Sequence, residues 1–138
     1  MKAERQDVWV ASLVDKPGSL AGKLAPLAEA GANLGFVIAR RSDKKKRDGV
    51  VFATPIKGRK QIAAAKKAGF RKTKSLHSVK VEGPDKPGIG AKITAALAEA
   101  GINLRGISAA AIGRKMVCHI AFDTSADAAK AIRIIKKL

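Results

Sequence analysis

An internal repeat dominates this chain of 138 residues. The segment Asp-Lys-Pro-Gly at 15–18 returns at 85–88, and Leu-Ala-Glu-Ala-Gly at 27–31 returns at 97–101. Across the twenty positions from residue 15 to residue 34, thirteen are identical to the residue that stands 70 positions later. A repeat of this kind indicates two copies of one structural unit, so the chain must fold as two similar modules rather than around one continuous core.

Each copy predicts the order strand, helix, strand, strand, helix. Runs of β-branched and apolar residues mark the strands, and apolar residues at helical spacing mark the helices. Gly31 and Gly101 are placed to end the first helix of each copy. The expected strands of the first copy are 8–14, 33–41, 49–56 and a short 71–75, with a hairpin loop at 42–48 and a second helix at 58–68; the second copy has strands at 77–82, 103–110 and 115–122 and helices at 89–100 and 124–138.

This order of elements is the ferredoxin-like plan. We therefore expect an α+β protein made of two ferredoxin-like βαββα(β) modules, each an antiparallel sheet with helices on one face. The expected boundaries are 1–74 and 75–138. The second copy has no fourth strand of its own, and exposed sheet edges are normally paired or covered. We expect either that the segment 69–82 is shared between the sheets or that a second chain completes them.

Two motifs carry a resemblance to a known family. One is an aspartate followed by Lys-Pro-Gly at the first strand-to-helix turn, beginning at Asp15 and Asp85, and the other is Glu-Ala-Gly-x-Asn-Leu, ending at Leu34 and Leu104. Both copies resemble the ACT domain, a small-molecule-sensing module attached to enzymes and regulators of amino-acid metabolism. The resemblance covers nearly the whole chain and implies a non-catalytic regulatory protein, a homodimer that binds an amino acid or similar small metabolite at ACT–ACT interfaces.

The resemblance also implies where the ligand would bind. In ACT domains, backbone amides of the first strand-to-helix loop and polar residues at the start of the second strand hold an amino acid between two modules. Gly18 and Gly88 would let the backbone approach a ligand closely, and the helix N-terminus that follows offers N–H donors to a carboxylate. The matching residues are Asp15, Lys16, Pro17, Gly18, Ser19 and Asn33 in the first copy, and Asp85, Lys86, Pro87, Gly88, Ile89 and Asn103 in the second.

A purely structural role for the same residues stays open. Asp followed closely by Pro-Gly commonly starts a helix, and Asn after a helix-ending Gly is ordinary turn chemistry. The copies also differ, because Gly90 stands where the first copy has Leu20 and where the family usually has a bulky apolar residue. We therefore do not expect the two loops to be equivalent.

The charge of the chain supports an alternative function. Its 28 Lys and Arg against 11 Asp and Glu give a net charge of +17, which divides into +9 for residues 1–70 and +8 for residues 71–138. The densest cluster, Arg40 to Arg47, could contact phosphates. However, RNA-recognition modules of this strand order stack bases on aromatic residues, and this chain is 4% aromatic with no tyrosine. A basic nucleic-acid- or acidic-partner-binding protein is therefore possible but not favoured.

Catalytic and metal sites are not expected. Cys118 and His119 are neighbours in one strand, so they point to opposite faces and cannot form a nucleophilic dyad. No clustered ligand spacing predicts a metal site, and nothing predicts a cofactor. No apolar stretch is long enough to span a membrane, and the first residues lack the apolar core of a signal peptide. We expect a cytoplasmic protein that does not contact membranes.

Overall fold

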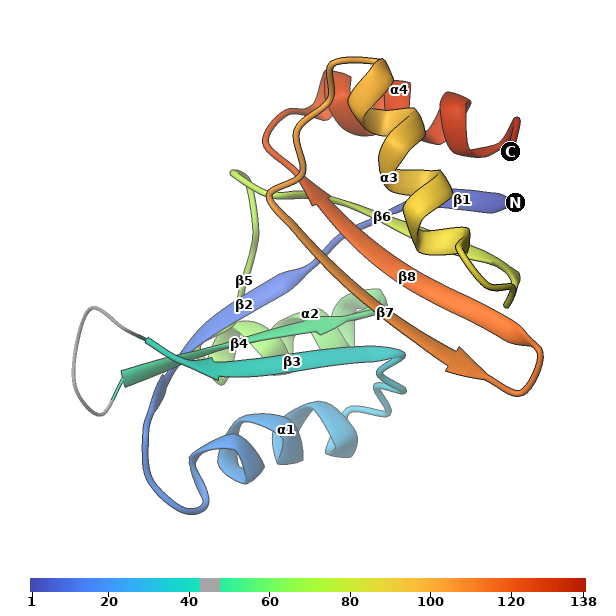
Figure 1. Ribbon diagram of the computed structural model, residues 1–138. Coiled ribbons are helices and arrows are strands. Elements are labelled where there is room, and N and C mark those ends of the chain that lie inside the picture. The colour runs from blue at the N-terminus through green and yellow to red at the C-terminus, as the bar shows by residue number, and fades with distance from the viewer. Residues whose placement is uncertain (43–47) are drawn as a thin grey trace. The chain divides into compact units, whose positions relative to one another are not determined.

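The computed structural model describes residues 1–42 and 48–138, which form two compact units. The first module comprises residues 7–73, and the second module comprises residues 1–6 together with 74–138. Each contains a four-stranded antiparallel sheet and two helices (Figure 1). The expected α+β class with two ferredoxin-like modules is confirmed.

The first module has the strand order β3-β4-β2-β5. Trp9 and Val51 lie on one face of this sheet, and the fully buried Leu27 and Ala65, one from each helix, belong to the same hydrophobic cluster. Burial of this face holds the module together. Its elements are β2 (Trp9–Val14), α1 (Ser19–Glu29), β3 (Phe36–Arg41), β4 (Asp48–Thr54), α2 (Gly58–Lys67) and β5 (Arg71–Lys72).

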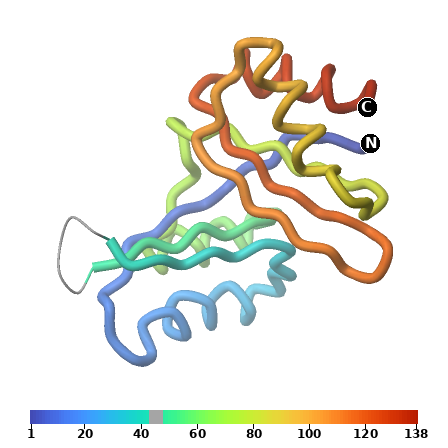
Figure 2. The backbone as a smooth tube through the Cα atoms, in the orientation of Figure 1, coloured from blue at the N-terminus to red at the C-terminus, as the bar shows by residue number. Residues whose placement is uncertain are grey.

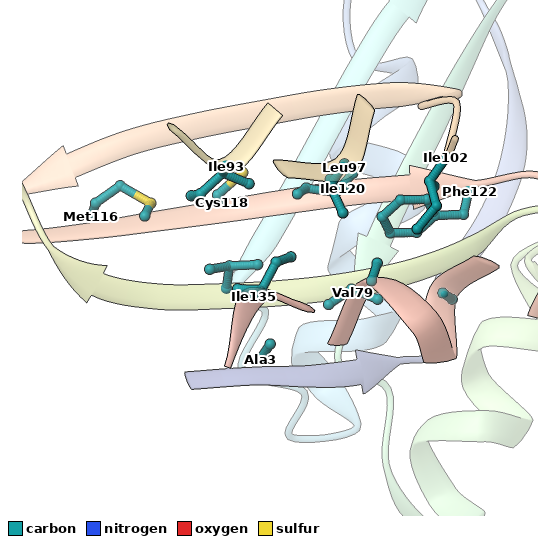
Figure 3. Close-up of a cluster of buried hydrophobic side chains, with 13 residues drawn as sticks. Ala3, Val79, Ile93, Leu97, Ile102, Met116, Cys118, Ile120, Phe122 and Ile135 are labelled. Carbon is teal, nitrogen blue, oxygen red and sulfur yellow. The ribbon is translucent and has the colours of Figure 1, made fainter. Parts of the chain in front are cut away.

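The second module has the strand order β1-β6-β8-β7. Figure 3 shows its core, in which Ile93 and Leu97 of one helix lie near Cys118 and Ile120 of the sheet, and Ile135 of the other helix belongs to the same cluster. Its elements are β1 (Lys2–Gln6), β6 (His77–Pro84), α3 (Ile89–Glu99), β7 (Gly106–Ile112), β8 (Lys115–Phe122) and α4 (Ser125–Ile135).

The expected elements agree with the observed ones to within a few residues at their ends. Pro26 lies inside α1, and the helix continues past it to Glu29, with the Pro26 carbonyl accepting from the Ala30 N–H at 3.2 Å. Gly31, with φ of +83°, follows the helix in the left-handed conformation that favours glycine. Of the expected hairpin loop at 42–48, residues 43–47 lie outside the described part of the chain.

The fourth strand of the second module comes from the start of the chain. β1 pairs antiparallel with β6, with Lys2 opposite Glu82 and Gln6 opposite Ser78 (Figure 1). This differs from our expectation, which put residues 1–6 in the first module and sought the missing strand in 69–82 or in a second chain. The physical reason is that Ala3 enters the second core, with 3% of its surface exposed. Both chain ends therefore lie in the second module (Figure 2).

Polar side chains hold the end of β1 in place. Arg5 Nη1 donates to the Ser125 carbonyl oxygen at 3.1 Å, and Arg5 Nη2 donates to His77 Nδ1 at 3.1 Å. On the other side of the strand, His119 Nδ1 donates to Gln6 Oε1 at 2.9 Å. Both histidines of the chain therefore contact the strand that completes the second sheet.

We expect His119 to make the stability of the second module depend on pH. Burial and the positive charge of Lys80 hold the pKa of His119 below its usual range, while Glu82 acts in the opposite direction. As the pH falls below the ordinary histidine pKa of about 6.5, the unfolded chain binds a proton that folded His119 resists, so the free energy of unfolding decreases. The slope from this one group is at most about 1.4 kcal/mol per pH unit.

Urea unfolding of the wild type and of His119→Gln at pH about 7.5 and about 5.5 checks this, because the two values bracket the ordinary histidine pKa. The wild type should lose more stability on acidification than the variant. Equal losses in the two proteins would show that His119 does not carry the effect.

Candidate functional site

The loop between β2 and α1 forms a tight turn. The Lys16 N–H donates to the Val14 carbonyl at 2.9 Å, and the Ser19 N–H donates to the Lys16 carbonyl at 3.3 Å. Gly18 has φ of +85°, and an added Cβ would meet no atom within 4 Å. Glycine is therefore favoured there by the backbone conformation and not by lack of space.

The first turn of α1 has unused hydrogen-bond donors. Gly18 provides no side-chain cap, and the first turn contains no acidic residue. The Gly22 N–H donates to the Gly18 carbonyl, whereas the N–H groups of Leu20 and Ala21 donate to no other group in the described part of the chain. This helix N-terminus can therefore stabilise an anion.

A cavity of about 200 Å³ lies beside this loop in the first module. Arg41 Nε lies 2.8 Å from Asp15 Oδ2, so an acidic and a basic group meet at the cavity. Gly49, opposite Arg41 in the sheet, has no room for a side chain, because an added Cβ would lie 2.8 Å from the Arg40 carbonyl oxygen. The cavity is lined by Leu13, Val14, Asp15, Lys16, Ser19, Leu20, Ala39, Arg40, Arg41 and Gly49.

The structure brings together only some of the residues expected in the first copy. Asp15, Lys16 and Ser19 line the cavity, and Pro17 and Gly18 belong to the same loop. Asn33 lies beyond the other end of α1, whose 11 residues span about 16 Å. Within one module, Asn33 therefore does not join the other five.

Arg41 is the site residue that sequence reasoning missed. The sequence groups Arg41 with the basic cluster of the hairpin. In the sheet, however, Arg41 lies opposite Gly49, and Gly49 lies opposite Leu13, just before the Asp15 loop. The expected strand order could have indicated that Arg41 ends its strand beside the Asp15 loop. The exact register across three strands was needed to place its side chain at the cavity.

The loop of the second module has the same backbone but different surroundings. Gly88 has φ of +82°, and the Ile89 N–H donates to the Lys86 carbonyl at 3.1 Å, as in the first module. The sheet residue that corresponds to Arg41 is Ala111, and Asp85 forms no ion pair within the described residues. Pro87 completes this loop, and Asn103 lies exposed beyond the far end of α3, as Asn33 does beyond α1.

Other reactive groups do not form a site. Cys118 points into the core and His119 to the opposite face, and burial raises the pKa of the Cys118 thiol to about 11. Among residues 1–42 and 48–138, no group of three or more His, Cys, Asp or Glu side chains could hold a metal ion. In the same residues, no helix is long and apolar enough to cross a membrane.

Comparison with known proteins gives one family match and several structural matches. Residues 77–138, somewhat less than half of the chain, match the family model described as ACT domain. No curated protein matches the sequence significantly.

Three solved structures resemble the chain over almost its whole length. A protein from Bacteroides thetaiotaomicron is 20% identical with a TM-score of 0.80, and the match covers 98% of this chain and 89% of that one. The ligand-free regulatory subunit of aspartate kinase from Thermus thermophilus is 17% identical, with a TM-score of 0.65 and coverage of 98% and 93%. The corresponding subunit from Thermus flavus is 19% identical, with a TM-score of 0.63 and coverage of 98% and 94%.

At these identities the structural matches establish the fold, and the family model adds the identity of the second module. The coverage shows that the fold similarity extends over both modules and is not confined to the matched segment. Residues 77–138 of this chain are an ACT domain, and residues 7–73 form a second ferredoxin-like module.

Proposed function

We propose that this is a regulatory protein whose first module binds a small amino acid in the cavity beside α1. The observation that carries the proposal is the Asp15–Arg41 pair at the cavity, next to the free N–H groups of the first turn of α1. A zwitterionic amino acid has one negative and one positive group close together, and this site offers a partner for each.

The geometry suggests a specific binding mode. The ligand carboxylate accepts from the N–H groups of Leu20 and Ala21 and from the Arg41 guanidinium, while the ammonium group pairs with Asp15. The side chain of the ligand contacts Leu13 and Leu20. Exposed ion pairs contribute only about 0–1 kcal/mol, so separating Asp15 from Arg41 costs little. The cavity volume of about 200 Å³ favours an amino acid with a small side chain.

A second copy of the chain would complete the site. β3 is an edge strand, and Val37 on it is 38% exposed. If β3 pairs antiparallel with β3 of another copy, the start of each strand lies beside the end of the other, which brings Asn33 of one copy towards Arg41 of its partner. We propose a homodimer of this kind, in which the bound ligand favours one arrangement of the two copies.

We propose further that the protein has no catalytic activity and acts in the cytoplasm. Its one cysteine, Cys118, is unpaired and buried, which is compatible with a reducing compartment. The regulatory subunits of aspartate kinase that it resembles match over more than nine-tenths of their own length.

The substitution Arg41→Gln tests the site. After calorimetric or thermal-shift screening against the twenty amino acids, we expect the variant to weaken the binding of a stabilising amino acid by roughly tenfold, because a charge-assisted hydrogen bond is lost. Arg41 is exposed, so the variant should fold normally.

The matched comparison is Asp15→Asn against Asp85→Asn, which make the same change in the two equivalent loops. Asp15→Asn should weaken binding and Asp85→Asn should not. The proposal fails if no amino acid stabilises the protein, or if the two loops respond alike.

The basic surface of α2 supports nucleic-acid binding as a second candidate function. α2 contains no acidic residue, and its cations, which are exposed, form no ion pair within the described residues. A protein that binds nucleic acid through such a surface loses affinity steeply as salt rises. Tight DNA or RNA binding at physiological salt, with no stabilisation by any amino acid, would favour this rival. The cations are Arg59, Lys60, Lys66 and Lys67, with Lys57 just before the helix.

A further inference from the structure

We propose that the second module has its own binding site, distinct from the Asp15 loop, which takes an amphipathic carboxylate on the face of the sheet that carries no helix. A cavity of about 660 Å³ lies there. It is more than three times as large as the cavity beside α1, and its volume falls within the range of about 300–1,000 Å³ that is typical of small-molecule sites. Its lining residues are Lys2, Glu82, Gly83, Pro84, Ile112, Lys115, Met116 and Val117.

Strand register places the cavity on the face opposite the core. Ala3, Val81 and Met116 point into the core. Side chains alternate along a strand, so their neighbours Lys2, Glu82 and Val117 point to the other face.

The register also brings residues from four strands together. Lys2 of β1 lies opposite Glu82 of β6, which lies opposite Val117 of β8. In the next row, Lys115 of β8 lies between Pro84 of β6 and Ile112 of β7. Each of the two rows thus combines charged and apolar side chains.

The charges at this cavity favour an anion. Glu82 accepts from Lys80, with Nζ 3.1 Å from Oε1, and Lys2 Nζ lies 3.8 Å from Oε2. Lys115 lies opposite Pro84, in the next row on the same face, and the positive charges of Lys80, Lys2 and Lys115 all lower the pKa of the Glu82 carboxyl. Glu4 lies opposite Lys80 on the same face, so three positive charges stand against two carboxylates and leave an excess of one, which a ligand carboxylate can pair with.

The apolar groups at the same cavity favour a ligand with a hydrocarbon body. Ile112 is 74% exposed, more than any other large hydrophobic residue in the described part of the chain. Pro84 and Val117 continue this surface. Covering it is favourable in proportion to the apolar area removed from water. A simple inorganic anion would leave Ile112 exposed, so the arrangement favours a carboxylate with an aliphatic or aromatic body.

Binding at this site would stabilise the pairing of β1 with β6 in the second module. Lys2 belongs to the N-terminal strand, whereas Lys115 and Ile112 flank the β7–β8 turn. A ligand that contacts all three prefers the state in which β1 is paired with β6, so it shifts the population towards that state. Amide exchange at β1 should therefore slow when the site is filled.

Octanoate is a suitable probe, with octanamide and acetate as comparisons that lack the charge or the hydrocarbon body. Methyl NMR of the full chain should show saturable octanoate binding at Ile112 and Val117, with affinity in the millimolar range, and no saturable binding of the two comparisons.

Lys115→Gln and Ile112→Ser should each weaken octanoate binding by roughly fivefold to tenfold. Arg114→Gln, which removes a neighbouring cation outside the cavity lining, should leave it unchanged.

The proposal is overturned if octanoate leaves the Ile112 and Val117 methyl signals unmoved, if octanamide binds equally well, or if Arg114→Gln weakens binding as much as Lys115→Gln. These results are separable from those for the amino-acid site, because the signals that report on Asp15 and Arg41 belong to the other module.

Discussion

Replacing Ala3 with aspartate is expected to unfold or severely destabilise the second module, by at least about 3 kcal/mol. Ala3 is 3% exposed and lies opposite Val81, in the same cluster as the core residues of α4. A carboxylate at this position would lose its hydration without gaining a partner. Because β1 completes the sheet, its loss would also leave the polar groups of the β6 edge unpaired.

The control for this variant is Glu4→Gln, an exposed position in the same strand, which should change stability by no more than about 0.5 kcal/mol. Hydrogen exchange of β6 and β8 amides measures the effect in the second module. The single tryptophan, Trp9, lies in the first module and reports its unfolding by fluorescence. If Ala3→Asp leaves β6 exchange as slow as in Glu4→Gln, β1 is not an integral strand of this module.

The second large effect is expected from a matched pair of core substitutions, Leu27→Ala and Leu97→Ala. These leucines occupy equivalent positions in the repeat, one in α1 and one in α3, and both are fully buried. Truncating a buried leucine removes its burial energy and leaves a cavity, at a cost of about 2–5 kcal/mol. Each variant should therefore lower the free energy of unfolding of its own module by that amount.

Urea unfolding followed by Trp9 fluorescence separates the two variants. The midpoint of the fluorescence transition should shift more in Leu27→Ala than in Leu97→Ala, because Trp9 and Leu27 share one hydrophobic cluster. Amide exchange in α3 and β8 should show the reverse order. A fluorescence shift that is larger in Leu97→Ala would contradict the division of the chain into these two cores.

Most of the fold could be predicted from the repeat and from apolar periodicity. These patterns are local, and each copy buries one face of its sheet and one side of each helix, so the expected elements match the observed ones closely. β1 could not be found this way. Its sequence, Lys-Ala-Glu-Arg-Gln, has a single apolar residue, and its pairing partner lies more than 70 residues away. Only the three-dimensional structure shows that Ala3 fits the second core.

The candidate site was predictable only in part. The loop at Asp15 follows from a local motif, and the structure shows the expected turn with Gly18 in the left-handed conformation. The participation of Arg41 depends on strand register, which local sequence does not determine. Gly90 indicates in the sequence that the two modules differ. The second copy also has Ala111 at the position equivalent to Arg41, but the effect of this difference on the site depends on where the two residues lie in the structure.

Amide NMR mapping tests directly whether the first module binds an amino acid beside α1. Glycine, L-alanine, L-serine and L-threonine would each be titrated into the full chain. We expect saturable shifts at the amides of residues 15–21 and at Arg41 with at least one of them, and no comparable shifts at residues 85–91. Shifts centred on residues 85–91, or no saturable shift in either loop with any of the four, would contradict it.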